Sequence, residues 1–77
     1  NFNERQADLI GTLITDSQRV LTIKEVEIKY DIVYQTARLD LLGLEKMGYL
    51  KSKNVGKKLV FYVVDDFDLK IRKLSKI

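Results

Sequence analysis

The segment from Leu21 to Leu50 constrains the fold most, because its pattern predicts two short helices joined by a tight turn. Thr22 and Glu25 have the spacing of a capping box, in which each side chain bonds to the backbone amide of the other residue. This box predicts that a helix begins at Ile23, and the apolar residues that follow extend it to Tyr30.

A second amphipathic helix is predicted from about Val33 or Tyr34 to Met47, after a turn at residues 31–32. Gly48 is expected to end this helix, since glycine adopts the left-handed conformation without a steric penalty from a Cβ atom. Two helices joined by so short a turn indicate a helix-turn-helix. The second helix of such a unit often enters the major groove of DNA.

Two strand-like segments follow the second helix directly. Residues 49–53 and 58–64 are rich in β-branched and aromatic side chains, and the polar turn between them contains Gly56. A helix-turn-helix followed by a β-hairpin has the element order of a winged helix. We therefore predict an α+β fold, a winged helix-turn-helix with a three-helix core and a hairpin wing. Residues 20–21 are expected to add a short strand beside the hairpin.

One helix is predicted before this unit and one after it. The first should span about residues 3–16, and apolar spacing after Val64 predicts a short C-terminal helix. We expect a winged-helix domain over residues 1–64 and a helical extension over residues 65–77. The inward stripe expected for the first helix comprises Leu9, Ile10, Leu13 and Ile14. The helical spacing that predicts the last helix is that of Phe67, Ile71 and Leu74.

The composition restricts the chemistry that the chain can carry out. The 77 residues include no cysteine and no histidine, which argues against zinc fingers and against thiol or imidazole catalysis. The acids at positions 65, 66 and 68 lack the partners that metal chemistry needs, and acids are common at a helix start. We therefore predict no catalytic residue, no metal site, no cofactor and no small-molecule substrate.

The chain contains no apolar run near the ~20 residues that cross a bilayer, and no signal-peptide pattern. We therefore expect a cytoplasmic protein with no membrane partner.

Positive charge is concentrated on the predicted hairpin. The net charge is only +3, and residues 1–32 carry more acidic than basic side chains, whereas residues 46–58 carry lysines and no acid. Such lysines can follow DNA phosphates, or they can keep an edge hairpin soluble and unpaired. The preceding helices favour nucleic acid. We predict that the phosphate contacts are made by Lys46, Lys51, Lys53, Lys57 and Lys58.

The exposed residues in the first two turns of the second helix of the helix-turn-helix are candidates for base contacts. Gln35 can pair bidentately with adenine, and Arg38 with guanine or a phosphate. Alternatively, Gln35 and Thr36 cap the helix, Arg38 pairs with Asp40 or Glu45, and Tyr34 packs on the wing. The predicted base-facing set is Tyr34, Gln35, Thr36, Arg38 and Leu39.

Apolar residues on the outer helix faces support a rival interpretation. Leu39 and Leu42 lie away from the predicted buried face, and Ile28 lies on the outer face of the preceding helix. Under this alternative, these three residues form a protein interface. The partner would be a neighbouring domain of the same chain or a second copy of it in a homodimer.

The second helix and the start of the hairpin resemble known sequence patterns. The DeoR-type pattern T-x-R-x-D-L-x-x-L-x-x-x-G-x-L is matched by Thr36, Arg38, Asp40, Leu41, Leu44, Gly48 and Leu50. The sequence of residues 33–38, 40–41 and 45–49 more closely resembles that of the winged helix at the C-terminus of many Fic-family proteins.

In Fic-family proteins a separate helical domain transfers AMP from ATP to a protein hydroxyl, using a loop with an essential histidine. This chain has no histidine, so the resemblance implies an appended DNA-binding or regulatory module of a bacterial type. The chain begins at Asn1 rather than at methionine, and we expect it to be part of a longer protein.

Overall fold

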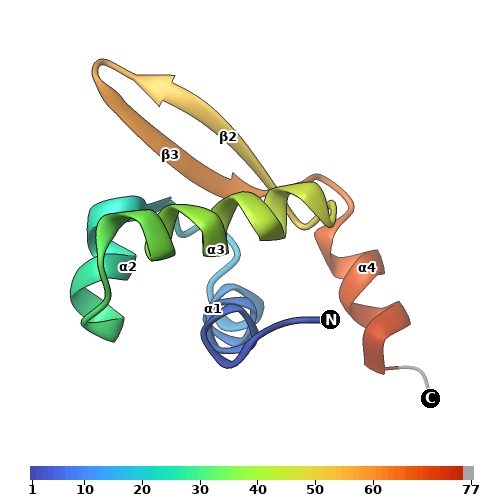
Figure 1. The fold of residues 1–77 in the computed structure, drawn as a ribbon. Helices are drawn as coiled ribbons and strands as arrows, with labels where there is room; N and C mark the ends of the chain where they lie inside the picture. The colour runs from blue at the N-terminus through green and yellow to red at the C-terminus, as the bar shows by residue number, and fades with distance from the viewer. Residues whose placement is uncertain (76–77) are drawn as a thin grey trace.

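The computed structural model describes residues 1–75, which form four helices and one three-stranded antiparallel sheet (Figure 1). The predicted α+β element order is confirmed. The last predicted residues of the C-terminal helix, 76 and 77, lie outside the described part. In chain order the elements are α1 (Glu4–Thr15), β1 (Leu21–Thr22), α2 (Ile23–Tyr30), α3 (Tyr34–Lys46), β2 (Leu50–Val55), β3 (Lys58–Val63) and α4 (Phe67–Ser75).

The sheet has the strand order β1-β3-β2, so the second strand of the hairpin is central and pairs with β1. Leu21 pairs with Phe61 across β1 and β3, while Val55 pairs with Lys58 at the hairpin end. Gly56, with a φ of 63°, makes the turn between the two long strands. Figure 1 shows the hairpin tip on the side of α2 and the start of α3, with α4 at the opposite end of the molecule.

The core draws buried side chains from every helix and strand. Ala37 of α3 is fully buried, as predicted, which lets α2 and α3 pack closely. Ile14 was expected in the core but is 54% exposed. The buried face of α1 instead runs through Gln6, Leu9 and Leu13, and Ile14 lies one residue, or about 100°, further around the helix.

The N-terminus of α2 is capped by only one half of the predicted box. Thr22 accepts a hydrogen bond from the backbone amide of Glu25 at 3.2 Å. The predicted hydrogen bond from the Thr22 backbone amide to the Glu25 side chain does not form. The Glu25 carboxylate accepts a hydrogen bond from Arg19 instead. A complete capping box forms on α1, where Asn3 and Gln6 each bond to the backbone amide of the other.

Gly48 ends α3 as predicted, with a φ of 90°. The amide of Tyr49 donates to the Leu44 carbonyl at 3.0 Å, and the amide of Gly48 donates to the Glu45 carbonyl at 2.9 Å. These two bonds are those of a Schellman motif, which satisfies carbonyls that the helix end leaves free. The chain therefore turns sharply from α3 into β2.

The two helix glycines are expected to respond oppositely to alanine. A Cβ atom on Gly11 would meet nothing within 4 Å, whereas one on Gly43 would lie 2.7 Å from Nε2 of Gln6. That nitrogen donates to the Asp40 carbonyl at 3.0 Å in a buried position. Gly11→Ala should stabilise the fold by about 0.5–1 kcal/mol. Gly43→Ala should destabilise it by about 1 kcal/mol, because a lost buried hydrogen bond outweighs the gain in helix propensity.

Urea denaturation followed by circular dichroism would measure both changes in the free energy of unfolding. Equal stabilisation by the two substitutions would contradict the close contact between Gly43 and Gln6.

Candidate nucleic-acid interface

Helix α3 has a fully buried face and a solvent-facing side. Ala37, Leu41 and Leu44 are completely buried, which fixes the rotation of the helix on the core. Of the five residues predicted to face DNA bases, Tyr34, Gln35 and Leu39 are exposed, whereas Thr36 and Arg38 flank the buried Ala37 and are half-buried.

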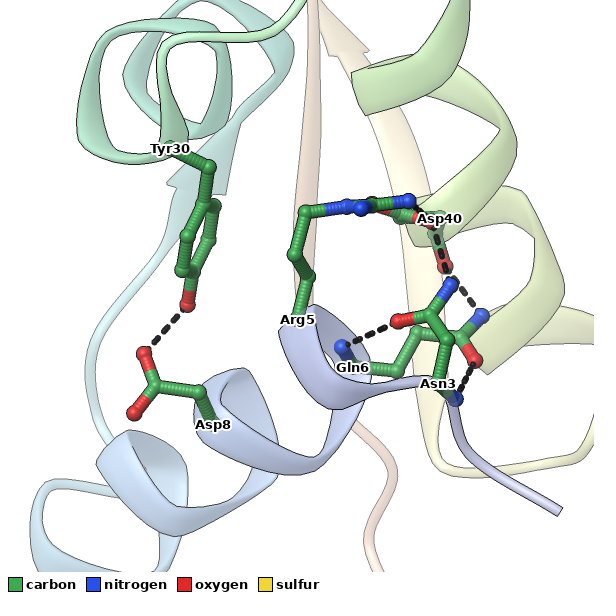
Figure 2. Close-up of polar contacts among 6 residues, drawn as sticks. All are labelled: Asn3, Arg5, Gln6, Asp8, Tyr30 and Asp40. Carbon is green, nitrogen blue, oxygen red and sulfur yellow. Dashed lines mark hydrogen bonds and ion pairs between the residues drawn. The ribbon is translucent and has the colours of Figure 1, made fainter.

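The middle of α3 is tied to the start of α1 by the buried carboxylate of Asp40 (Figure 2). It accepts hydrogen bonds from Nε and Nη2 of Arg5 at 2.6 and 3.3 Å, and from Nδ2 of Asn3 at 2.8 Å. The bond to Asp40 raises the pKa of the Arg5 guanidinium above its ordinary value. These contacts join residues more than thirty positions apart, and local sequence patterns did not indicate them.

The alternative partners predicted for Arg38 are occupied by other residues. Asp40 pairs with Arg5, and the Glu45 carboxylate accepts a hydrogen bond from the Ser52 hydroxyl at 2.9 Å. Within residues 1–75, Arg38 forms no salt bridge. The alternative in which Arg38 pairs with Asp40 or Glu45 is therefore wrong for the described residues, because each acid has another donor.

A second polar contact holds α1 against the end of α2. Figure 2 shows the Tyr30 hydroxyl donating to the Asp8 carboxylate. This hydrogen bond and the nearby Lys29 ammonium, 3.4 Å away, lower the pKa of Asp8. Partial burial and the Asp8 carboxylate raise the pKa of the Tyr30 phenol well above its ordinary value. The helix-turn-helix is thus fixed to α1 through both of its helices.

A groove of about 300 Å³ separates the first turn of α3 from the hairpin turn. Tyr34 lines it from α3, and Asn54, Lys57 and Lys58 line it from the hairpin. Lys24 of α2 also lines it, together with Thr22, Ile23 and Leu59, and no acidic residue does. The groove therefore carries three ammonium groups beside the helix that was predicted to read bases.

The predicted set of phosphate-contacting lysines did not include Lys24, because residues 1–32 carry a net negative charge when charge is counted along the sequence. The pairing of β1 with β3 brings the N-terminus of α2 beside the hairpin. Only this long-range contact shows that Lys24 and Lys58 share a surface.

Solved structures from several bacteria share this architecture, although the sequence matches no protein-family model and no curated protein. The homodimeric winged helix-turn-helix DNA-binding domain of Mb0332 from Mycobacterium bovis superposes with a TM-score of 0.72 at 15% identity. The match covers 94% of this chain and 64% of that one. The fold is a winged helix.

Two further solved structures match at a similarly low identity. A mutant of MepR from a multidrug-resistant S. aureus isolate gives a TM-score of 0.76 at 14% identity, over 100% of this chain and 58% of that one. YusO from Bacillus subtilis gives 0.71 at 14% identity, over 95% and 52% of the two chains. This winged helix therefore spans only about half to two thirds of the length of these proteins.

The lysines that were predicted to contact phosphates, most of them on the wing formed by β2 and β3, differ in whether they contact other side chains of the fold. Lys51 lies 4.0 Å from Asp65, and Lys53 lies over the Tyr62 ring at 5.6 Å. Both therefore have neighbours within the fold. Lys46, Lys57 and Lys58 are exposed and form no salt bridge with any described residue. Of the five lysines predicted to contact phosphates, only Lys57 and Lys58 line the groove beside α3.

The three apolar residues predicted to form a protein interface do not share one environment. Ile28 is 70% exposed and Leu39 is 56% exposed. Leu42 was expected on the outer surface but is half-buried and packs against the core. It follows Leu41 by about 100° around α3, so it borders the buried face instead of opposing it.

The part of the chain that the structure describes also bears on other functions. Among residues 1–75, no group of three or more acidic side chains is arranged to hold a metal ion. None of the described helices is both long and apolar enough to span a bilayer.

Proposed function

We propose that this winged helix is a duplex-DNA-binding module of a transcription regulator. The observation that carries the proposal is the cationic groove between the wing turn and the first turn of α3. A duplex that places α3 in its major groove would bring its backbone to Lys57 and Lys58, where counterion release favours binding. The description of Mb0332 as a DNA-binding domain supports the same role for this fold.

In this arrangement the outer side of α3 contacts the bases. Arg38 has no ion pair with another described residue and reaches guanine or a phosphate, while Gln35 is exposed and pairs with adenine. Leu39 offers an apolar contact for a thymine methyl group, and Tyr34 directs its hydroxyl to a phosphate. Lys46, Lys51 and Lys53 remain proposed phosphate contacts outside the groove.

The test of this proposal is fluorescence-anisotropy titration of a random-sequence duplex at about 50 and 200 mM salt. Binding should weaken steeply with salt, and Lys57→Ala/Lys58→Ala should reduce the slope of log K against log salt by about 1–2. Lys73→Ala, an exposed lysine of α4 at the other end of the molecule, is the control and should change little. Absence of salt-dependent binding by the native chain would overturn the proposal.

Arg38→Ala should act on sequence preference. On a duplex selected for tight binding we expect the affinity to fall about tenfold, within the range for losing a bidentate base contact. On random duplex the loss should be smaller. Equal affinity of the variant and the native chain for the selected duplex would remove Arg38 from the base-contacting set.

The resemblance of residues 33–49 supports a finer proposal, that this module is a regulatory C-terminal domain of a Fic-family protein. The full-length gene tests it directly. A helical domain with the histidine-containing loop before this winged helix would support the assignment, and a different preceding domain would contradict it.

A second candidate function is docking on a neighbouring domain or on a second copy of the chain. The exposure of Ile28 and Leu39 favours it, and Mb0332 is described as homodimeric. Sedimentation velocity of the native chain and of Ile28→Glu/Leu39→Glu tests this surface. An assembly that survives both substitutions would exclude it.

A further inference from the structure

A second hollow of about 690 Å³ borders the cationic groove along the outer side of α2. Lys24 and Lys58 line both hollows, so positive charge continues from the wing turn across α2. Arg19, in the loop before β1, and Lys29, in the last turn of α2, also line the second hollow. Glu25 is its one acidic lining residue.

The four basic groups of this hollow are not equally available to a ligand. Lys24 and Lys58 are exposed and form no salt bridge within residues 1–75. Lys29 lies 3.4 Å from the Asp8 carboxylate and is directed toward α1. Arg19 is held by Glu25. The Arg19 guanidinium is therefore available to a ligand only when it leaves Glu25.

The pair of Arg19 and Glu25 is one that a phosphate can displace. The two side chains are 43% and 34% exposed, so water and salt screen their attraction. A phosphate offers the same bidentate geometry to a guanidinium as a carboxylate does. Exchange of partners gives Arg19 a phosphate oxygen in place of the Glu25 oxygen, but it leaves the Glu25 carboxylate beside the ligand, where its charge opposes binding.

We infer that this second hollow binds a further run of phosphates of the same duplex, and that Glu25 limits its affinity by occupying Arg19. Lys24 then contacts backbone from both hollows, and Arg19 joins the interface when it leaves Glu25. The inference rests on the proposed DNA-binding function. It extends the DNA footprint from α3 and the wing to the start of α2.

The role of Glu25 is tested by Glu25→Gln in the anisotropy titration with random-sequence duplex. Affinity at low salt should rise about threefold to fivefold, and the salt slope should steepen by about 0.9 as Arg19 joins the phosphates. Glu4→Gln is the matched control, because Glu4 is also an acid in the first turn of a helix but lines neither hollow. Arg19→Gln/Glu25→Gln should lose the gain.

Lys24→Gln tests the shared contact, with Lys73→Gln as its control on α4. We expect Lys24→Gln to weaken binding severalfold and to flatten the salt slope, while Lys73→Gln leaves both nearly unchanged. Melting followed by circular dichroism checks that every variant is folded. If Glu25→Gln and Glu4→Gln had equal effects, or if the two lysine substitutions did, the affinity would depend only on the net charge of the protein. Either result would overturn the inference.

The two proposals fail in distinguishable ways. If Lys57→Ala/Lys58→Ala weakens binding while Lys24→Gln and Glu25→Gln both leave the affinity and the salt slope unchanged, the second hollow is excluded and the wing contact stands. If the native chain shows no salt-dependent binding to duplex, the DNA-binding function falls and this inference falls with it.

Discussion

Replacing Phe61 by alanine is expected to lower the free energy of unfolding by about 3–5 kcal/mol, the usual cost of deleting a large buried aromatic side chain. Phe61 is completely buried in β3, the central strand of the sheet. It pairs with Leu21 of β1 on one side and with Ser52 of β2 on the other. Its ring therefore supports the place where the wing joins the helices.

The expected loss is a large share of the total stability. A domain of this length unfolds with a free energy of roughly 4–12 kcal/mol. If the native value lies near the lower end of this range, Phe61→Ala should be partly unfolded at about 37 °C. Phe61→Leu is the matched control, since it retains most of the volume and should cost less than about 1.5 kcal/mol. Urea denaturation measures both. If Phe61→Ala lost less than about 1 kcal/mol, the base of the wing would not be packed as described.

The elements of this fold could be predicted from sequence because their signals are local. Thr22 bonds to an amide three residues away, and Gly48 ends α3 through a conformation that its own lack of a side chain permits. Helix and strand order follow from such signals, and the order of the elements indicated the winged helix.

The errors came where a helix was assigned a buried face without knowledge of its neighbours. Ile14 and Leu42 each lie one residue beyond a fully buried leucine, and the packing of α1 and α3 decides on which side of the boundary they fall. Sequence periodicity does not define the edge of an apolar stripe to within one residue. The stripe on α1 proved narrower than predicted, and that on α3 broader.

The candidate site was predicted less completely than the fold, because it depends on contacts between distant segments. A count of charge along the sequence selected the hairpin lysines, but the structure separates Lys51 and Lys53 from the groove and adds Lys24. Likewise, Glu25 was expected to complete a helix cap, and it holds Arg19 instead.

Asp40→Ala should have the second large effect on stability. We expect a loss of about 2–3 kcal/mol, because hydrogen bonds to a charged group contribute more than neutral ones and this carboxylate accepts three of them in a buried position. The backbone carbonyl of Asp40 keeps its bond from Gln6, so the change isolates the side chain. Asp40→Asn preserves the size of the side chain but turns an NH₂ group toward the donors of Arg5 or Asn3. It should therefore recover only part of the loss.

A double-mutant cycle of Arg5→Ala and Asp40→Ala, measured by urea denaturation, separates the ion pair from the bond that Asn3 donates. The two losses should not be additive, since each substitution removes the same contact. Additive losses, or an Asp40→Ala variant as stable as the native chain, would mean that water satisfies these groups equally well. Because Asp40 lies on the inner side of the helix that carries Arg38, non-additivity would also show that α1 and the proposed DNA-reading helix are energetically coupled through this ion pair.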